Sequence, residues 1–266
     1  MPIDPTARVH SSVEIDPSNE VGPNVTIEAD VVIGLRNQIM AGAFIGPGTT
    51  IGDDNRIHMR AVVGHEPQDY AFEGEQSFTR IGNRNEIREF ATIHRGTGEG
   101  TTTEVGDDCF IMVHAHIAHN CVIGSKVTLA NLCSMAGHVS IGDGAFISGN
   151  CVIHQYCRIG ALSMLGGLSA VNRDLPPFML ARGRPAAVAG VNAIGLRRAS
   201  IGPEVRKELK RAYKTIYRAG NRLTDGLAEL AEIDMPEIQT LVRFIEESKR
   251  GIMIGAEGGG ARDNGE

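Results

Sequence analysis

Aliphatic residues recur at every sixth position along most of the chain. The series runs unbroken from Ile3 to Val63, resumes at Ile81 and, after a second lapse, continues to Val171. A repeat of fixed length decides the architecture, so it is the first feature to establish. An α-helix has a period of 3.6 residues and a lone amphipathic strand has a period of 2. Neither element alone therefore produces a period of six.

A short strand followed by a tight turn, once in six residues, accounts for this period. Three such units close a triangular coil of eighteen residues, and stacked coils form a left-handed parallel β-helix with the aliphatic residues inside. The position four residues after each aliphatic is small or slim, as at Ala7, Asn37 and Ala61, which suits a narrow inner corner. We predict a mainly β fold: a left-handed parallel β-helix of hexapeptide repeats followed by a small α-helical C-terminal domain.

The repeat is interrupted twice and stops before the last third of the chain. Residues 64–80 and 96–104 carry Pro, Gly and acidic residues where aliphatics are due, and we predict loops that leave the coil there. The β-helix is expected to occupy residues 1–175. Apolar residues at helical spacing predict a helical domain over 191–250. The Gly-rich residues 251–266 are expected to form a disordered tail.

Composition narrows the class of protein. The chain has no leader-like segment and no apolar stretch near ~18 residues, so we expect a cytoplasmic protein without a transmembrane segment. The net charge of −6 gives no support to nucleic-acid binding. All five cysteines fall at the inner corner position, where Cys acts as a compact apolar residue, and we predict reduced core residues rather than disulfides or metal ligands. They are Cys109, Cys121, Cys133, Cys151 and Cys157.

Six of the nine histidines fall between positions 94 and 154. Residues eighteen apart stack vertically in such a coil, so His119, Gly137 and Gln155 are predicted to form one outward-facing column. An imidazole beside a glycine with an open N–H pairs a general base with an oxyanion donor. Imidazole also suits removal of a hydroxyl proton near neutral pH. No Ser or Cys pairs with His119 as a nucleophile, so direct transfer is favoured over a covalent intermediate.

The histidines also allow a metal site. The segment HAHIAH at 114–119 supplies three imidazoles in six residues, and zinc can be held by such ligands between subunits. Against this interpretation, no carboxylate is expected to lie close to the rings and orient them. His10 and His114 are better explained as exposed turn residues. Proton transfer at His119 is therefore favoured, and no metal ligand is assigned.

The predicted helical domain contains a strongly basic stretch. Residues 195–222 include nine basic and two acidic residues. A basic helix on an acidic protein favours docking of an anionic partner, and a solvated helix face without a partner is the alternative. The flat, repetitive faces of a β-helix can pack side by side, which predicts a cyclic homo-oligomer.

Several stretches of the chain are more specific than the repeat. They are PQDYAFEGE at 67–75, IGNRNEIREFATIHRGT at 81–97, HIAHNCVIG at 116–124, AGHVSIGD at 136–143, VIHQYCRIG at 152–160 and GVNAIGLRR at 190–198. Together with the helical C-terminus, they resemble the UDP-N-acetylglucosamine O-acyltransferase family over nearly the whole chain.

This resemblance implies the first step of lipid A biosynthesis, in which an R-3-hydroxyacyl chain passes from acyl carrier protein to the glucosamine 3-position of UDP-N-acetylglucosamine. The only cofactor it implies is the phosphopantetheine carried by the acyl carrier protein. It further implies a homotrimer, with the acidic carrier protein docked on the basic helix.

The resemblance also implies roles for individual residues. His119 matches the general base, and Gly137 matches the backbone donor to the thioester oxyanion. Gly167 matches the floor of the acyl groove, where a glycine leaves room for a long chain. The residues implied in substrate binding are Gln68, Asp69, His94, His116, His138, His154, Gln155, Gly167, Asn192 and Arg198.

The chain departs from the family pattern at several positions. Asn120 stands beside the base where the family often has Asp. Ile194 replaces an acidic nucleotide contact, Ala199 replaces an Arg, and Ala71 replaces a frequent Lys. These departures leave open whether the acceptor is the 3-hydroxyl or a 3-amino group of the UDP-sugar.

Other functions compete with this one. The N-acyltransferase of the same pathway is less favoured because it carries an extra N-terminal domain, whereas the coils here start at Ile3. A γ-type carbonic anhydrase site would bind zinc. A non-catalytic scaffold would need neither substrate nor metal.

Overall fold

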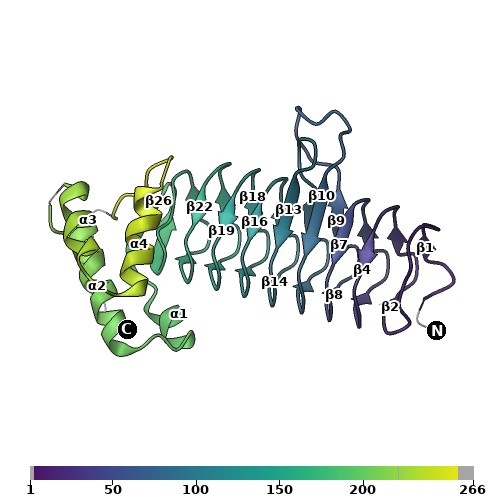
Figure 1. Cartoon of the computed structure of the whole chain (residues 1–266), viewed down its shortest axis with the longest axis horizontal. Helices are drawn as coiled ribbons and strands as arrows, with labels where there is room; N and C mark the ends of the chain where they lie inside the picture. Colours follow the sequence, from purple (N-terminus) through teal and green to yellow (C-terminus); the bar gives the residue numbers. More distant parts are fainter. Residues whose placement is uncertain (1–2, 221, 257–266) are drawn as a thin grey trace.

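The computed structural model describes residues 3–220 and 222–256, which form a three-sided prism with helices packed at its C-terminal end (Figure 1). Short strands stack in parallel into three sheets, and the chain visits the first, second and third sheet in turn. Paired residues in neighbouring coils, such as Thr128 and Phe146, are eighteen positions apart except where a loop intervenes. The structure is therefore the parallel β-helix that the six-residue period predicts.

Each sheet takes one strand from each coil. The first sheet contains β1 (Arg8–Val9), β3 (Thr26–Ile27), β6 (Phe44–Ile45), β9 (Val62–His65), β12 (Thr92–His94), β15 (His116–Ile117), β18 (Ser134–Met135), β21 (Val152–Ile153) and β24 (Ala170–Val171). The second contains β4 (Val32–Ile33), β7 (Thr49–Ile51), β10 (Phe78–Ile81), β13 (Thr102–Val105), β16 (Val122–Ile123), β19 (Ser140–Ile141) and β22 (Arg158–Ile159). The third contains β2 (Glu20–Val21), β5 (Gln38–Ile39), β8 (Arg56–Ile57), β11 (Glu86–Ile87), β14 (Phe110–Ile111), β17 (Thr128–Leu129), β20 (Phe146–Ile147), β23 (Met164–Leu165), β25 (Met179–Gly183) and β26 (Ala186–Val191).

The core is the interior of the prism. The aliphatic residue of each repeat is buried, and Ile45, Ile87 and Leu129 have no exposed surface. Burial of one such side chain contributes about 1.5–3 kcal/mol. Each coil adds its own buried side chains and packs only on its neighbours, so the stability of the core increases coil by coil. All five cysteines are buried and free, as predicted from their corner positions.

One inner corner of the N-terminal coils carries a column of buried asparagines, Asn19, Asn37, Asn55 and Asn85. The Oδ1 atom of Asn37 accepts hydrogen bonds from the backbone N–H (2.8 Å) and the side-chain amide (3.0 Å) of Asn55. The same side-chain amide of Asn55 also donates to the Gly82 carbonyl at 2.9 Å. The column therefore satisfies backbone groups that the turns would otherwise leave buried and unpaired.

Two loops leave the prism and contact each other. The first joins β9 to β10, and the second joins β12 to β13; both project from the middle of the prism (Figure 1). The Gly98 N–H of the second loop donates to the Glu75 carboxylate of the first at 2.6 Å. The predicted second loop is too long, because residues 102–104 belong to β13. Thr103 is buried there and pairs with Thr79, since a slim Thr fits the inner corner as well as a small apolar residue does.

The C-terminal end of the prism differs from the prediction. β25 extends the third sheet by pairing with β23, and β26 returns antiparallel to β25. The β-structure therefore runs past residue 175. This hairpin carries no six-residue period, because its strands are longer than those of a coil.

In the described part of the chain, four helices follow the hairpin: α1 (Ala193–Arg198), α2 (Pro203–Tyr217), α3 (Leu223–Ala231) and α4 (Pro236–Glu246). Within the described residues, no helix is both long enough and apolar enough to cross a membrane. Residues 251–256 are ordered, contrary to the predicted tail: Met253 is buried, and Ile252 pairs with Asp174. The remainder of the predicted tail, 257–266, lies outside the described residues.

Candidate active site

His119, Gly137 and Gln155 lie on successive rungs at the corner between the first and second sheets, which we call corner 1–2. The strands that precede them, β15, β18 and β21, pair in register. The backbone continues this stacking, because the His138 N–H donates to the His119 carbonyl at 3.0 Å. The vertical column predicted from the eighteen-residue coil is therefore present.

A cavity of about 460 Å³ opens along corner 1–2. It is lined by residues of the first loop and of three successive rungs. They are Gln68, Asp69, His116, Ala118, His119, Ser134, Met135, Ala136, Gly137, Val152, Ile153 and Gln155. The structure thus brings together six of the residues expected from the sequence: Gln68, Asp69, His116, His119, Gly137 and Gln155.

The imidazole of His119 lies outside the prism, as predicted, but it is not an exposed ring. The residue is only 9% exposed because the two loops cover it. A carboxylate oxygen of Asp69 lies 3.4 Å from its Nε2 atom. The expectation that no carboxylate approaches these histidines is therefore wrong, because the first loop folds back over the corner.

Asn120 determines which nitrogen of His119 carries the proton. The Asn120 Oδ1 atom accepts a hydrogen bond from the Thr97 N–H at 2.9 Å, and the Asn120 side-chain amide donates to the Thr97 carbonyl at 3.2 Å. These two bonds fix the orientation of the carboxamide. The oxygen lies 2.8 Å from Nδ1 of His119, so Nδ1 must be the donor. In the neutral ring, Nε2 is then left with a free lone pair toward the cavity.

Gly137 supplies a close backbone approach beside this ring. A side-chain Cβ at residue 137 would lie 2.3 Å from Cε1 of His119, so any residue other than glycine would displace the ring. The neighbouring Ala136 and His138 N–H groups donate to backbone carbonyls, whereas the Gly137 N–H makes no backbone hydrogen bond within the described part of the chain. This N–H is therefore available to an oxyanion.

Two more histidines pack around the base. His138 meets the His119 ring edge-on at 5.3 Å and stacks on Tyr156 at 4.6 Å. Nδ1 of His116 lies 2.7 Å from the Thr92 hydroxyl. Burial and, secondarily, the nearby His119 lower the pKa values of both His138 and His116. Two adjacent imidazolium cations repel each other, so these rings stay neutral when His119 accepts a proton.

His94 and His154 do not line the cavity. The His94 ring lies 5.1 Å from that of His116 but is itself buried, and its Nδ1 has no hydrogen-bond partner within the described residues. The exposed His154 bonds to the backbone carbonyl of Gln155 at 3.1 Å. His94 therefore supports the cavity wall from behind, and His154 lies on the outer surface beside the cavity.

His94 should make the stability of the protein depend on pH. Burial, followed by the nearby imidazoles, lowers its pKa to about 4, from the ordinary histidine value of 6.5. Between these values the unfolded chain binds a proton that the folded chain excludes, so stability falls as the pH drops from 6.5 toward 4. A shift of this size corresponds to about 3 kcal/mol. Denaturant unfolding at pH 7 and pH 4.5 should show a smaller loss for His94→Gln than for the unsubstituted protein, and equal losses would contradict the assignment.

Gly167, Asn192 and Arg198 are not near this cavity. Gly167 follows β23 at the corner between the third and first sheets, which we call corner 3–1. The Asn192 side chain caps α1 through the Gly195 N–H (3.0 Å) and donates to the Leu162 carbonyl at 2.9 Å, on the corner between the second and third sheets. Arg198 is exposed at the end of α1. A single copy of the chain does not place these residues beside His119.

The three imidazoles of HAHIAH also diverge. His114 is exposed at corner 3–1 and stacks on Phe90 at 5.0 Å, whereas His119 lies at corner 1–2. Within residues 3–220 and 222–256, no group of three or more His, Cys, Asp or Glu side chains is arranged to hold a metal ion. The histidines of HAHIAH therefore lie at two corners and on the intervening strand of one coil.

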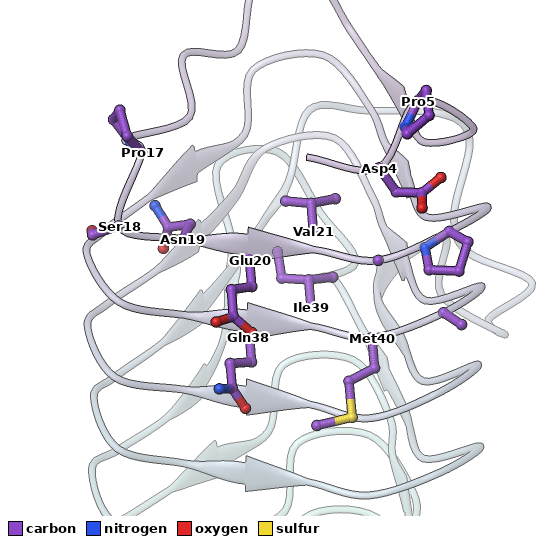
Figure 2. Close-up of a pocket in the computed structure, with 13 residues that line it drawn as sticks. Asp4, Pro5, Pro17, Ser18, Asn19, Glu20, Val21, Gln38, Ile39 and Met40 are labelled. Carbon is purple, nitrogen blue, oxygen red and sulfur yellow. The ribbon is translucent and has the colours of Figure 1, made fainter. Parts of the chain in front are cut away.

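A larger hollow, of about 900 Å³, lies at the N-terminal end of the prism (Figure 2). Figure 2 shows Glu20 on one rung and Gln38 and Met40 on the next, with Pro5 and Pro17 on the surrounding turns. This hollow is lined by β2 and β5 of the third sheet and by the turns that flank them. It contains no His, Cys or other nucleophilic side chain beyond Ser18, so the chemistry points to corner 1–2 instead.

Comparison with known proteins agrees with this architecture. Residues 174–253 match the family model described as UDP N-acetylglucosamine O-acyltransferase, domain 2. Residues 102–137 match the model of the bacterial transferase hexapeptide, six repeats. The two matches cover the helical end of the chain and the coils around His119.

Full-length relatives match almost the whole chain. The acyl-[acyl-carrier-protein]–UDP-N-acetylglucosamine O-acyltransferases of Burkholderia lata and Alkalilimnicola ehrlichii are 44% and 43% identical, each over 94% of this chain and 98% of the relative. The solved UDP-N-acetylglucosamine acyltransferase of Francisella novicida superposes with a TM-score of 0.93 at 36% identity, over 96% of this chain and 95% of that one. That of Campylobacter jejuni gives 0.85 at 38% identity, over 96% and 100%. The chain therefore belongs to the UDP-N-acetylglucosamine O-acyltransferase family of hexapeptide-repeat proteins.

Proposed function

We propose that this protein transfers an R-3-hydroxyacyl chain from acyl carrier protein to the glucosamine 3-position of UDP-N-acetylglucosamine, the first step of lipid A biosynthesis. The observation that carries the proposal is the pairing of His119 and Gly137 in one cavity. The imidazole there presents a free Nε2, and the adjacent glycine presents an N–H without a backbone acceptor. The family relationship supplies the identity of the two substrates.

The proposed reaction is a direct acyl transfer. Nε2 of His119 takes the proton of the sugar hydroxyl as its oxygen attacks the thioester carbonyl carbon. The Gly137 N–H donates to the oxyanion of the tetrahedral intermediate. Collapse of the intermediate breaks the C–S bond, and the departing thiolate receives the proton from the His119 imidazolium. No covalent enzyme intermediate is required, which agrees with the burial of every cysteine.

Two neighbours prepare His119 for this role. The neutral Asn120 holds Nδ1–H and thereby directs the basic nitrogen at the substrate. The Asp69 carboxylate, 3.4 Å from Nε2, favours the imidazolium that forms during transfer. The negative charge therefore acts from the loop side of the ring rather than from the residue next to the base.

We further propose that the protein is a homotrimer whose active sites lie between copies. The corners of one prism point away from each other, so Gly167 and Arg198 reach the His119 cavity only from a second chain. An exposed apolar ridge at corner 3–1 supports such packing, because large apolar groups on a surface indicate interfaces. The ridge consists of Met59 (45% exposed), Phe90 (46%), Leu132 (50%) and Leu168 (57%). Gly167 lies next to Leu168, so this ridge also suits the acyl chain.

The basic stretch of 195–222 is the proposed docking surface for acyl carrier protein, an acidic partner. Its exposed cations lie mainly on α2, whose apolar face packs Leu209 and Ala212 against the rest of the helical domain. Long-range attraction of opposite charges raises the rate of encounter and weakens as salt rises. Turnover at low carrier concentration should therefore fall as salt is added.

The function is tested by incubating the protein with R-3-hydroxyacyl carrier protein and UDP-N-acetylglucosamine and analysing the products by mass spectrometry. We expect a sugar nucleotide that has gained one hydroxyacyl group and a carrier that has lost it. The same assay with the 3-amino UDP-sugar separates the two acceptor atoms. Absence of acyl transfer to either sugar would overturn the proposal.

Sharing of the site between chains is tested by mixed assemblies. Co-assembly of His119→Ala with Arg198→Ala chains should restore activity, because a mixed trimer contains one interface with both residues intact. This regain is at most about one third of the unsubstituted activity. Mixing His119→Ala with Asp69→Ala should restore nothing, since His119 and Asp69 meet within one chain. Equal results from the two mixtures would contradict the shared site.

A further inference from the structure

A second cavity, of about 270 Å³, lies between α1, the first turns of α2 and the end of β26. Its apolar wall is formed by Val191, Leu196 and Pro203, and its remaining wall carries the side chains of Arg206, Lys207 and Lys210. The cavity is adjacent to Asn192 in sequence but separate from the cavity around His119.

The charge of this second cavity is not compensated by the protein. No carboxylate lines it, and none of its three cations forms an ion pair with any of the residues that the structure describes. Arg211, the next residue along α2, behaves differently: it pairs with Glu208 (3.7 Å) and Glu229 (2.9 Å). The cavity therefore gathers three cations of α2 that form no ion pair with the described residues.

One of these cations is also incompletely bonded. The Nε atom of Arg206 is buried, and it has no hydrogen-bond acceptor in the described part of the chain. Buried donors without a partner are uncommon and usually indicate a missing ligand or water. Three like charges around one small cavity repel each other, and a bound anion would relieve this repulsion.

The donors in this cavity suit a phosphate group. A guanidinium offers paired N–H donors that match phosphate oxygens, and two ammonium groups add charge without a directional requirement. A phosphate ester carries one to two negative charges. It can therefore offset more of the positive charge of the three side chains than a single carboxylate could. The apolar wall can contact the organic part of such an ester.

We propose that the cavity of Arg206, Lys207 and Lys210 binds a phosphate ester of one of the two substrates. This inference rests on the proposed function, in which both the UDP-sugar and the phosphopantetheine of the carrier supply such a group. Binding there adds attraction outside the reacting centre, so it affects substrate affinity rather than the chemical step.

The test compares an Arg206→Gln/Lys210→Gln double variant with Arg243→Gln/Lys249→Gln, which removes two cations from α4 and the segment after it. Steady-state kinetics should show a KM at least tenfold higher for one substrate in the first variant, with kcat within about twofold of the unsubstituted value. The control pair should leave both KM values unchanged. Arg206→Met/Lys210→Met, which keeps the aliphatic stems, should reproduce the effect if charge rather than packing is responsible.

The identity of the affected substrate assigns the phosphate. A higher KM for the UDP-sugar alone assigns the pyrophosphate. A higher KM for the acyl carrier alone assigns the phosphopantetheine if acyl-phosphopantetheine, which lacks the carrier protein, shows the same rise; a rise confined to the intact carrier would reflect its docking on the basic stretch and would contradict the phosphate site. In the second case, acyl-pantetheine without its phosphate should be used equally well by the unsubstituted protein and the variant. If neither KM changes, the proposal is wrong.

A direct measurement separates this proposal from the proposed function. A calorimetric titration with inorganic pyrophosphate should detect binding to the unsubstituted protein and at least tenfold weaker binding to the double variant. This readout does not need turnover. Equal pyrophosphate binding by both proteins would overturn the phosphate site even if the transferase activity is present. Weaker binding by the double variant, in a protein that shows no transferase activity, would overturn only the proposed reaction.

Discussion

His119→Ala is expected to lower kcat for acyl transfer by roughly 10³-fold, since a general base typically contributes 10²–10⁴-fold. The imidazole presents Nε2 to the cavity, Asn120 holds its Nδ1, and the Asp69 carboxylate lies 3.4 Å from Nε2, where it stabilises the imidazolium formed during transfer. Removing the ring leaves the Gly137 N–H in place, so a residual activity from oxyanion binding and substrate alignment should remain.

Product formation with 3-hydroxyacyl carrier protein measures this loss. His10→Ala is the matched control, because His10 is exposed in the first coils, far along the chain from corner 1–2, and should retain full activity. Thermal unfolding should show that His119→Ala keeps the β-helix intact, because the ring lies outside the prism core. Turnover within tenfold of the unsubstituted protein would remove His119 from the mechanism.

Gly137→Ala is expected to cost a comparable amount, roughly 10²–10³-fold in kcat, although it adds only one methyl group. The new Cβ would lie 2.3 Å from Cε1 and 2.4 Å from Nε2 of His119, so the imidazole must move. A displacement near 1 Å at a reacting group can cost about 10²-fold. The bulk beside the residue 137 N–H also restricts access of the thioester oxygen to its oxyanion donor.

Gly190→Ala controls for the loss of a glycine, because a Cβ there has no heavy atom within 4 Å. It should be active and stable. Gly137→Ala should also fold, since its cost falls on the position of one side chain outside the core. Normal kcat in Gly137→Ala would show that the ring and the glycine amide do not have to be in contact for catalysis.

The sequence predicts well whatever follows from the eighteen-residue coil. Every coil repeats one backbone path, so residues eighteen positions apart occupy equivalent places. This spacing predicts the inward aliphatic residues, the corner cysteines and the column of His119, Gly137 and Gln155. The paired strands β15, β18 and β21 have this register in the structure. Site geometry could be predicted here because it depends on a periodic backbone rather than on loops.

The surroundings of His119 could not be predicted in the same way. Asp69 comes from a loop without periodicity, fifty residues earlier in the chain, so its place over corner 1–2 does not follow from the repeat; only the family resemblance of residues 67–75 pointed to the site. The double hydrogen bond between Asn120 and Thr97 likewise joins the corner to the second loop. The tautomer of His119 depends on these loop contacts, so the sequence indicated a base but not which nitrogen would act.

The helical end was predicted only in part. The short helix α1 and the hairpin of β25 and β26 have no strong period, and they are held by contacts with the last coils, such as the hydrogen bond from Asn192 to Leu162. The basic charge of α2 was visible in the sequence. Which of these cations form ion pairs could be learned only from the structure. Arg211 pairs with Glu229 on α3, whereas Arg206 has no ion pair among the described residues.

The geometry of the base can be measured directly by ¹⁵N NMR of histidine-labelled protein, with His119→Gln used to assign the signal. In the neutral ring, we predict a proton bonded to Nδ1 and a bare Nε2. A ring with its proton on Nε2, or one that exchanges freely between both forms, would contradict a base held by Asn120 and directed at the substrate.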